Sequence, residues 1–175
     1  MINQEKLIAE LGDIYGKTIA DLGCGAGAWS IEFADRIGPD GSVMAVDVDQ
    51  NILERCAKDV EEKKLQNIHI IRANFAVIGG TGLQDGIADI SLLINTIFQN
   101  DAEEYDDIFA EVNRITKLGG RVIVVDWAES FGQMGPSVDD VFSRDEAIKY
   151  GEKAGLRLLR EFDVGYYHYG IVFEK

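Results

Sequence analysis

Segments with the composition of β-strands and segments with the apolar spacing of helices alternate along nearly the whole chain. This alternation limits the fold more than any other feature, because a strand, a helix and a further strand form a right-handed crossover in a parallel sheet. The expected strands are residues 17–21, 42–47, 68–72, 88–94, 121–126, 156–163 and 167–174. The sequence therefore predicts an α/β fold with a doubly wound, mostly parallel sheet of seven strands.

Two regions depart from this alternation. Only residues 164–166 separate the last two expected strands, and strands joined by so short a connection pair as an antiparallel hairpin. We therefore expect an antiparallel last strand. Residues 74–87 contain four glycines, so this segment is either a degenerate crossover helix or a loop. No repeat or linker divides the sequence, which predicts a single domain over residues 1–175.

Two expected helices begin with a capping box, in which a small polar residue is followed three positions later by an acid. The first is Asp101 with Glu104, and we expect its helix to end at Gly119–Gly120. The second is Ser143 with Glu146.

The charge balance bears on the partners of the chain. Asp and Glu number 31 against 17 Lys and Arg, so the formal net charge is −14. Such an excess of negative charge repels phosphate backbones, which argues against nucleic acid and favours a small-molecule substrate. No apolar run reaches the roughly 20 residues of a membrane helix, so we expect no membrane partner.

Two further features predict a cytoplasmic protein. Residues 1–16 lack the basic and then apolar layout of a secretory signal. Cys24 and Cys56 are too few for a disulfide framework, and their spacing matches no metal-binding pattern. We expect both thiols to be reduced and structural, and we expect no metal.

A glycine-rich segment follows the first expected strand. Gly23, Gly25 and Gly27 form a Gly-x-Gly-x-Gly pattern, here named the glycine loop, and Asp21 stands two positions before it. Glycines let the backbone turn sharply and let a ligand approach without a Cβ in the way. The next strand ends at Asp47, whose carboxylate can accept hydrogen bonds from both hydroxyls of a ribose across the same crevice.

This segment carries a resemblance to a known family. The first motif of class I S-adenosylmethionine-dependent methyltransferases closely resembles the run Asp21-Leu22-Gly23-Cys24-Gly25-Ala26-Gly27. The likeness extends to Asp47 after VMAV, the apolar strand before Asn95 and the closing hairpin, and is most similar to the small-molecule branch that contains quinone-biosynthesis methylases. It implies a Rossmann-like fold and an enzyme that transfers a methyl group from S-adenosylmethionine to a small-molecule acceptor by direct in-line displacement.

The resemblance also implies roles for individual residues. The glycine loop would lie under the methionine half of the cofactor, and Asp21 would face the amino group of that half. Asp47 would hold the ribose hydroxyls, with Val48 against the adenine.

Three more residues complete the set that the resemblance implies. Asn74 and Phe75 match the adenine-side pair, although the family usually has Asp at the position of Asn74; an Asn oxygen can still accept from the adenine amino group. Asn95 would lie beside the methionine moiety. The run Asn95-Thr96-Ile97-Phe98 lacks the Asn/Asp-Pro-Pro-aromatic signature of amino-directed DNA methylases, which again argues against nucleic acid.

Two other functions fit parts of the pattern. Gly23, Gly25 and Ala28 also satisfy a dinucleotide motif with Asp47 as its ribose acid, so an NAD-binding Rossmann oxidoreductase is the first alternative. A cofactor-binding protein without catalysis is the second. Asp21 weighs against NAD, because a carboxylate ahead of the loop suits an ammonium group and has no evident use for a dinucleotide.

The acceptor side is less defined. We expect the acceptor between residues 96–101 and 127–143, after the fourth and fifth strands. No catalytic base is assigned, because the need for one depends on the acceptor; His168 and Asp126 are the candidates. The short segment before the first strand leaves the crevice open, so a homodimer that closes it is one expected assembly.

Overall fold

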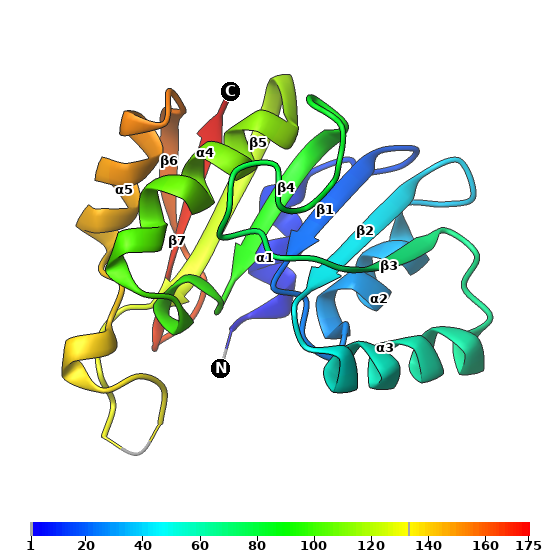
Figure 1. Cartoon of the computed structure of the whole chain (residues 1–175), viewed down its shortest axis with the longest axis horizontal. Helices are drawn as coiled ribbons and strands as arrows, with labels where there is room; N and C mark the ends of the chain where they lie inside the picture. The colour runs from blue at the N-terminus through cyan, green and yellow to red at the C-terminus, as the bar shows by residue number, and fades with distance from the viewer. Residues whose placement is uncertain (1, 133) are drawn as a thin grey trace.

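A seven-stranded sheet runs through the computed structural model, which describes residues 2–132 and 134–175. The strand order is β3-β2-β1-β4-β5-β7-β6 (Figure 1). The strands are β1 (Thr18–Leu22), β2 (Ser42–Asp47), β3 (Ile68–Arg72), β4 (Ala88–Ile94), β5 (Thr116–Trp127), β6 (Arg157–Asp163) and β7 (His168–Glu174). The predicted fold class, including the antiparallel last strand, is confirmed.

Helices cover both faces of this sheet. They are α1 (Gln4–Leu11), α2 (Ala28–Arg36), α3 (Gln50–Lys63), α4 (Tyr105–Ile115) and α5 (Arg144–Lys153), with short 3-10 turns η1 (Ile97–Gln99), η2 (Ala102–Glu104) and η3 (Val138–Asp140). α1 and α2 bury apolar side chains in one core cluster. α4 and α5 bury theirs in a second cluster on the opposite face. The periodic apolar residues of the sequence thus form two cores separated by the sheet.

The order of the strands reverses direction at β1. β1 pairs in parallel with β2 on one side and with β4 on the other, so successive crossovers run in opposite directions from β1. In open α/β sheets the crevice at such a switch point, beyond the carboxyl ends of the strands, is where ligands bind. The glycine loop follows β1 at this edge, and Asn95 follows β4.

The last two strands form the predicted hairpin. β7 pairs antiparallel with β5 and with β6, and it lies between them. β7 is buried along almost its whole length, whereas β6 forms the edge of the sheet and carries charged residues. Charged side chains on an edge strand oppose pairing with other chains.

One helix boundary differs from its prediction. α4 ends at Ile115 rather than at Gly119–Gly120, and β5 begins at Thr116. Thr116 adopts an extended backbone, with φ of −77° and ψ of 137°, so the helix ends four residues early; its N–H and its hydroxyl both donate to the Val112 carbonyl, the hydroxyl at 2.6 Å. The two glycines instead lie in an irregular start of β5, where a Cβ on Gly120 would come within 2.8 Å of the Lys117 carbonyl oxygen.

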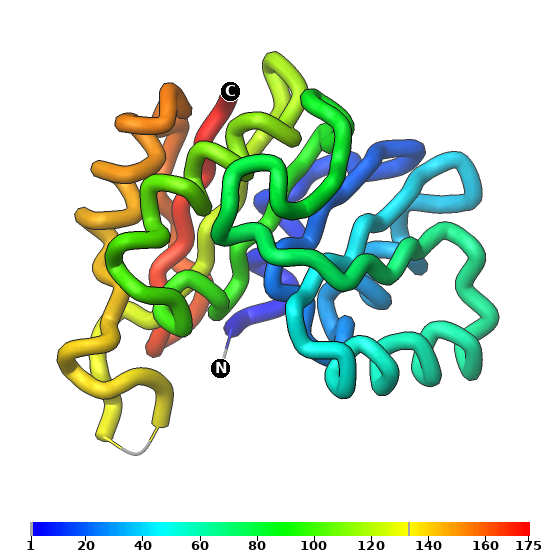
Figure 2. Tube along the Cα trace, viewed as in Figure 1, coloured from blue at the N-terminus to red at the C-terminus, as the bar shows by residue number. Residues whose placement is uncertain are grey.

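The segment between β3 and β4 is a loop, here named the crossover loop (residues 74–87). Figures 1 and 2 show it crossing the same face of the sheet as α4. It still contributes apolar side chains to the core there, from Phe75 and Ala76 near its start and from Leu83 and Ile87 near its end. The open choice between helix and loop is thereby decided: the apolar contacts of a helix are kept without helical backbone.

Candidate active site

Each glycine of the glycine loop has φ between +55° and +82°, a backbone conformation that side chains disfavour. Their surroundings differ. A Cβ on Gly23 would overlap Thr96 Oγ1, and a Cβ on Gly27 would overlap Cys56 Sγ, so these two positions permit close packing of the protein on itself. A Cβ on Gly25 would meet nothing within 4 Å. Gly25 is therefore the one glycine of this loop with open space where a Cβ would lie.

Asp47 lies directly against the glycine loop. Its carboxylate accepts from the Gly25 backbone N–H at 2.9 Å and from the Asp49 N–H at 3.0 Å, one bond to each oxygen. The structure thus brings together the two parts of the site that the sequence predicted to meet. Each carboxylate oxygen has a second lone pair, so Asp47 keeps acceptor capacity for further donors.

Asp21 is a buried carboxylate, 2% exposed at the end of β1. Burial raises its pKa to about 6, against the hydrogen bond that Ser30 Oγ donates, and repulsion from Asp47 adds to the rise. No Lys or Arg within residues 2–132 and 134–175 pairs with it. At neutral pH the site therefore holds a largely ionised carboxylate that lacks a cation.

Asn95 has an unsatisfied oxygen at the same edge. Its backbone is left-handed, with φ of 52°, directly after β4. Its side-chain Oδ1 is buried and accepts no hydrogen bond from any residue that the structure describes. Buried polar atoms are normally satisfied, so this oxygen is available to a donor that the protein itself does not supply.

The adenine-side residues predicted by resemblance differ in what they present. The Val48 side chain is 52% exposed and free to contact a ring. Asn74 is exposed, and its Oδ1 accepts from the Ala76 backbone N–H at 2.9 Å, which fixes the orientation of the amide. The Phe75 ring is buried in the core, so its backbone is what it can offer to a ligand.

The two candidate bases lie at the far end of this edge. Burial raises the pKa of Asp126 to about 7, against backbone N–H donors from Trp127, Phe98 and Ile97. These bonds tie Asp126 to the turn after β4. Burial lowers the pKa of His168 to about 4, and its ring packs on Trp127 at a centroid distance of 4.3 Å. Both residues are therefore packed into the protein, and their role as a base stays a prediction.

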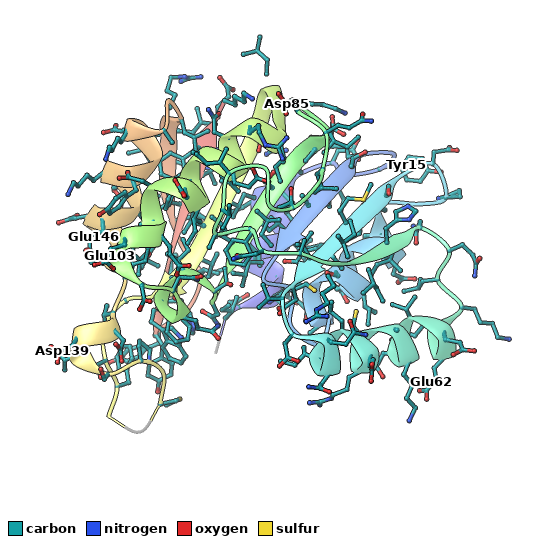
Figure 3. The ribbon with its side chains drawn as sticks, viewed as in Figure 1. Tyr15, Glu62, Asp85, Glu103, Asp139 and Glu146 are labelled. Carbon is teal, nitrogen blue, oxygen red and sulfur yellow. The ribbon has the colours of Figure 1, made fainter. Side chains whose placement is uncertain are left out.

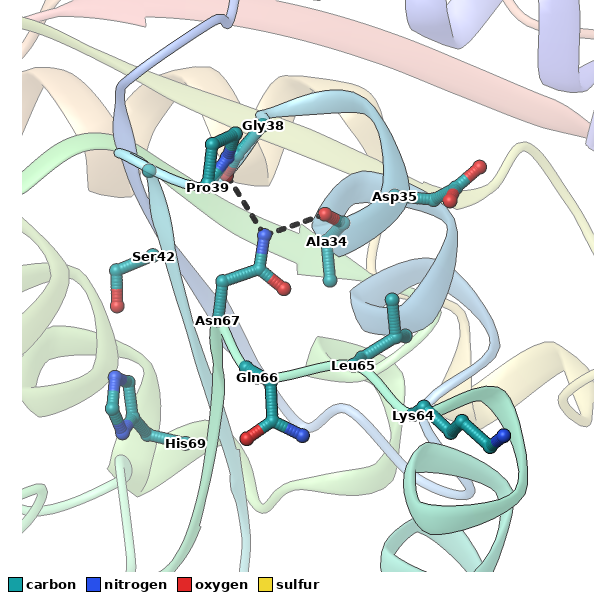
Figure 4. Close-up of a pocket in the computed structure, with 11 residues that line it drawn as sticks. Ala34, Asp35, Gly38, Pro39, Ser42, Lys64, Leu65, Gln66, Asn67 and His69 are labelled. Carbon is teal, nitrogen blue, oxygen red and sulfur yellow. Dashed lines mark hydrogen bonds between the residues drawn. The ribbon is translucent and has the colours of Figure 1, made fainter.

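A hollow of about 530 Å³ lies at the opposite edge of the sheet, near the amino ends of β2 and β3. Asn67 spans one side of it and donates to the carbonyls of Ala34 at 2.7 Å and Gly38 at 2.9 Å (Figure 4). These bonds satisfy carbonyls at the carboxyl end of α2. The hollow is remote from the glycine loop, and we give it no part in the candidate site.

The negative charge is spread over the surface. Glu62, Asp85, Glu103 and Asp139 lie on different elements of the fold (Figure 3). The described residues contain no group of three side chains able to hold a metal ion. They also include no helix long and apolar enough to cross a membrane.

Comparison with known proteins identifies the class. Residues 15–155 match the family described as methyltransferase domain, and the chain belongs to this family. It is 29% identical over 121 residues to a demethylmenaquinone methyltransferase of Lactococcus lactis, which covers 69% of this chain and 46% of the relative. A demethylmenaquinone methyltransferase of Listeria welshimeri is 27% identical, over 84% of this chain and 64% of the relative. The chain thus spans about half to two thirds of the length of these relatives.

A solved structure supports the same assignment. A SAM-dependent methyltransferase from Aquifex aeolicus superposes with a TM-score of 0.87 at 26% identity, over 98% of this chain and 89% of that one. The predicted resemblance to class I methyltransferases, in a branch similar to quinone-biosynthesis methylases, is confirmed. The NAD-binding alternative is not favoured by these findings.

Sequence reasoning missed one group that bears on the site. Glu111, which is buried, and Arg114, whose side chain is 21% exposed, form an ion pair on α4 that contacts the crossover loop. The sequence does contain a signal for it. Glu111 lies three positions after Ile108 and four before Ile115, on the face of the helix that is otherwise apolar. An acid at a core position of an amphipathic helix is costly unless it is paired.

Proposed function

We propose that this chain binds S-adenosylmethionine where β1, β2 and β4 end, and transfers its methyl group to a small-molecule acceptor. The observation that carries the proposal is the contact between Gly25 and Asp47. It sets the open side of the glycine loop beside a carboxylate suited to ribose hydroxyls. Membership of the methyltransferase domain family supports the same conclusion.

The residues present fit the cofactor. Asp21 offers a buried negative charge to the ammonium of the methionine half, and the unsatisfied Oδ1 of Asn95 offers an acceptor beside it. Asp47 would hold the ribose. Val48 and Asn74 would contact the adenine, with the Phe75 backbone beside them.

The chain's part in catalysis is positioning. When bound, the cofactor supplies a methyl group on a positively charged sulfur, which is already electrophilic. The glycine loop lets the backbone approach closely, while Asp21 would hold the ammonium of the methionine half and Asp47 the ribose. Alignment of an acceptor behind the methyl can lower the barrier by several kcal/mol, and up to about 7–11 kcal/mol in well-oriented systems. No base is assigned, since a nucleophile that is already deprotonated needs none.

Thermal shift tests the cofactor. S-adenosylhomocysteine should raise the melting temperature in a concentration-dependent way, and NAD should not. Stabilisation by NAD alone overturns the proposal. Gly25→Ala should remove the effect, because the new Cβ enters the open side of the loop. Gly16→Ala is the matched control: Gly16 has a similar φ of 69° and open space, but lies before β1, away from the crevice.

Transfer is tested with a methyl-labelled cofactor. Label should move to a member of a panel of small metabolites, and quinone-type compounds come first because two relatives are named for demethylmenaquinone. Tight cofactor binding with no transfer on broad panels favours a cofactor-binding protein without catalysis.

We also propose a cytoplasmic location, the absence of a nucleic-acid partner, and a homodimer. A cytoplasmic location is supported by the free thiols of Cys24 and Cys56. The absence of a nucleic-acid partner is supported by the net charge of −14, and a shift of tRNA or duplex DNA at 0.1 M salt would contradict it. A homodimer that closes the crevice is tested by light scattering on the purified chain.

A further inference from the structure

We propose that Glu111 is a positioning residue of the cofactor site: it clamps the crossover loop so that Asn74 is held at the adenine edge. The inference rests on the proposed function, because it takes Asn74 as a contact of the adenine. Glu111 lies on α4 and need not touch the ligand. Through the crossover loop it would still control how the site recognises the adenine.

The clamp consists of direct hydrogen bonds to the loop. The Glu111 carboxylate is fully buried and accepts from the Gly79 N–H at 2.7 Å, from the Thr81 N–H at 3.2 Å and from the Thr81 hydroxyl. Burial alone would raise the pKa of Glu111, but Arg114 and these donors hold it at about 2. Glu111 is therefore ionised at neutral pH, and donors of the loop surround its carboxylate.

Arg114 extends the clamp. It donates to both Glu111 oxygens, at 2.8 Å each, and to the Leu83 carbonyl at 2.8 Å. It also donates to the Thr81 hydroxyl oxygen at 3.3 Å and to Asp85, whose side chain is 82% exposed. The pair thus fixes the crossover loop over residues 79–85, a stretch without regular secondary structure of its own.

The path from the clamp to Asn74 passes through Gly80. The clamp holds the N–H groups on both sides of this glycine, Gly79 and Thr81. A Cβ on Gly80 would overlap the Asn74 carbonyl oxygen and would lie 2.8 Å from the Val77 carbonyl oxygen. The Gly80 backbone therefore packs directly on the backbone of Asn74, and the position of one sets the position of the other.

This path requires that residue 80 have no side chain. At Gly80 a side chain would push Asn74 away. At Gly82, by contrast, φ is +67° and a Cβ would meet nothing within 4 Å. Of these two glycines only Gly80 contacts Asn74, so Gly82→Ala, which strains the loop backbone at a positive φ without meeting Asn74, serves as the control.

The experiment measures recognition of the base. Calorimetric titration gives the affinities of S-adenosylhomocysteine and of S-inosylhomocysteine, in which a carbonyl replaces the adenine amino group. Because Ala76 fixes the Asn74 oxygen, the parent should prefer the adenine form by about tenfold or more. Gly80→Ala and Glu111→Gln should reduce this preference to about twofold, and Gly82→Ala should leave it unchanged.

The outcomes separate the two proposals. If the parent does not bind S-adenosylhomocysteine, the proposed function fails. If the parent binds but shows no preference, or if Gly80→Ala keeps the full preference, the clamp proposal alone is wrong. A merely structural role would weaken both ligands equally and leave the preference unchanged, which also overturns the proposal. Gly80→Ala changes neither charge of the ion pair, so it tests the Gly80–Asn74 step of the path even where Glu111→Gln does not fold.

Discussion

Two buried carboxylates, one at the glycine loop and one at the crossover loop, show opposite electrostatics. Burial raises the pKa of Asp21 to about 6, and no cation among the described residues offsets it. Burial acts on Glu111 in the same direction, yet Arg114 and the loop donors hold its pKa at about 2. At the crossover loop, Arg114 and the loop donors offset the cost of burying the Glu111 carboxylate. Beside the glycine loop, no cation among the described residues offsets the cost of burying Asp21. Strongly perturbed carboxylates without a partner cluster at functional sites, and this difference supports the proposal that Asp21 faces the ammonium of the cofactor.

The largest expected effect comes from removing the Glu111 carboxylate, the paired member of this comparison. Glu111→Ala leaves Arg114 without its buried partner and frees the crossover loop, so the free energy of unfolding should fall by about 3–5 kcal/mol. Urea denaturation measures it. Asp85→Ala removes only the exposed contact of Arg114 and should cost less than about 1 kcal/mol. Equal losses in the two variants would show that burial does not govern this pair.

The next effect concerns Asp47, which accepts a hydrogen bond from the glycine loop. Asp47→Ala should weaken the binding of S-adenosylhomocysteine by roughly 2–4 kcal/mol, or about 30- to 1,000-fold, because hydroxyl bonds to a carboxylate and the support of Gly25 are lost together. Asp47→Asn should lose less, since its amide oxygen still accepts. Titration calorimetry measures both, with exposed Asp40→Ala as the control. Binding within threefold of the parent means that Asp47 does not hold the ribose.

Asp21→Asn sharpens the comparison from the other side. Because the folded pKa of Asp21 lies above its usual 3.8, the folded state binds the proton more tightly, and ionisation lowers stability as pH rises from about 4 to 6. The variant removes this cost. Its ligand-free form should be about 1–3 kcal/mol more stable than the parent at pH 8 and no more stable at pH 4. Thermal unfolding at both pH values decides it, and a variant destabilised at pH 8 would contradict the reasoning.

The smallest effect is in the pH dependence of binding. If the ligand ammonium requires ionised Asp21, with a pKa of about 6 in the free protein, affinity for S-adenosylhomocysteine should fall about tenfold between pH 7.5 and pH 5. Asp21→Asn should bind more weakly at pH 7.5 but with a nearly flat profile. A parent profile as flat as that of the variant would remove Asp21 from the cofactor site.

Most of the fold was predictable because its signals are local. Apolar runs, capping residues and the short connection before β7 each act within a few residues, and they located the strands and the hairpin. The predicted end of α4 was wrong because Thr116 already adopts the extended backbone of β5, ahead of the two glycines. The crossover loop stayed undecided, since its structure depends on Glu111, about 30 residues away along the chain.

The candidate site divides in the same way. The meeting of the glycine loop with Asp47 was predictable from strand order, because parallel strands end at one edge. The orientation of Asn74 was not, because it depends on a bond to Ala76 that no spacing rule requires. The unsatisfied Oδ1 of Asn95 likewise depends on three-dimensional burial.

The pairing of β1 with β4 has a consequence for how the chain reaches this structure. Ile19 lies opposite Ile90, and every residue between them must be looped out before the two strands can pair. Closing so long a loop costs conformational entropy before any contact between the two strands offsets it. Parallel pairs between distant segments therefore form slowly. The edge that carries the glycine loop and Asn95 therefore forms only once distant parts of the chain have met. A ligand that contacts the ends of both β1 and β4 would bind only chains in which this late pairing is complete, and would thereby stabilise the paired state.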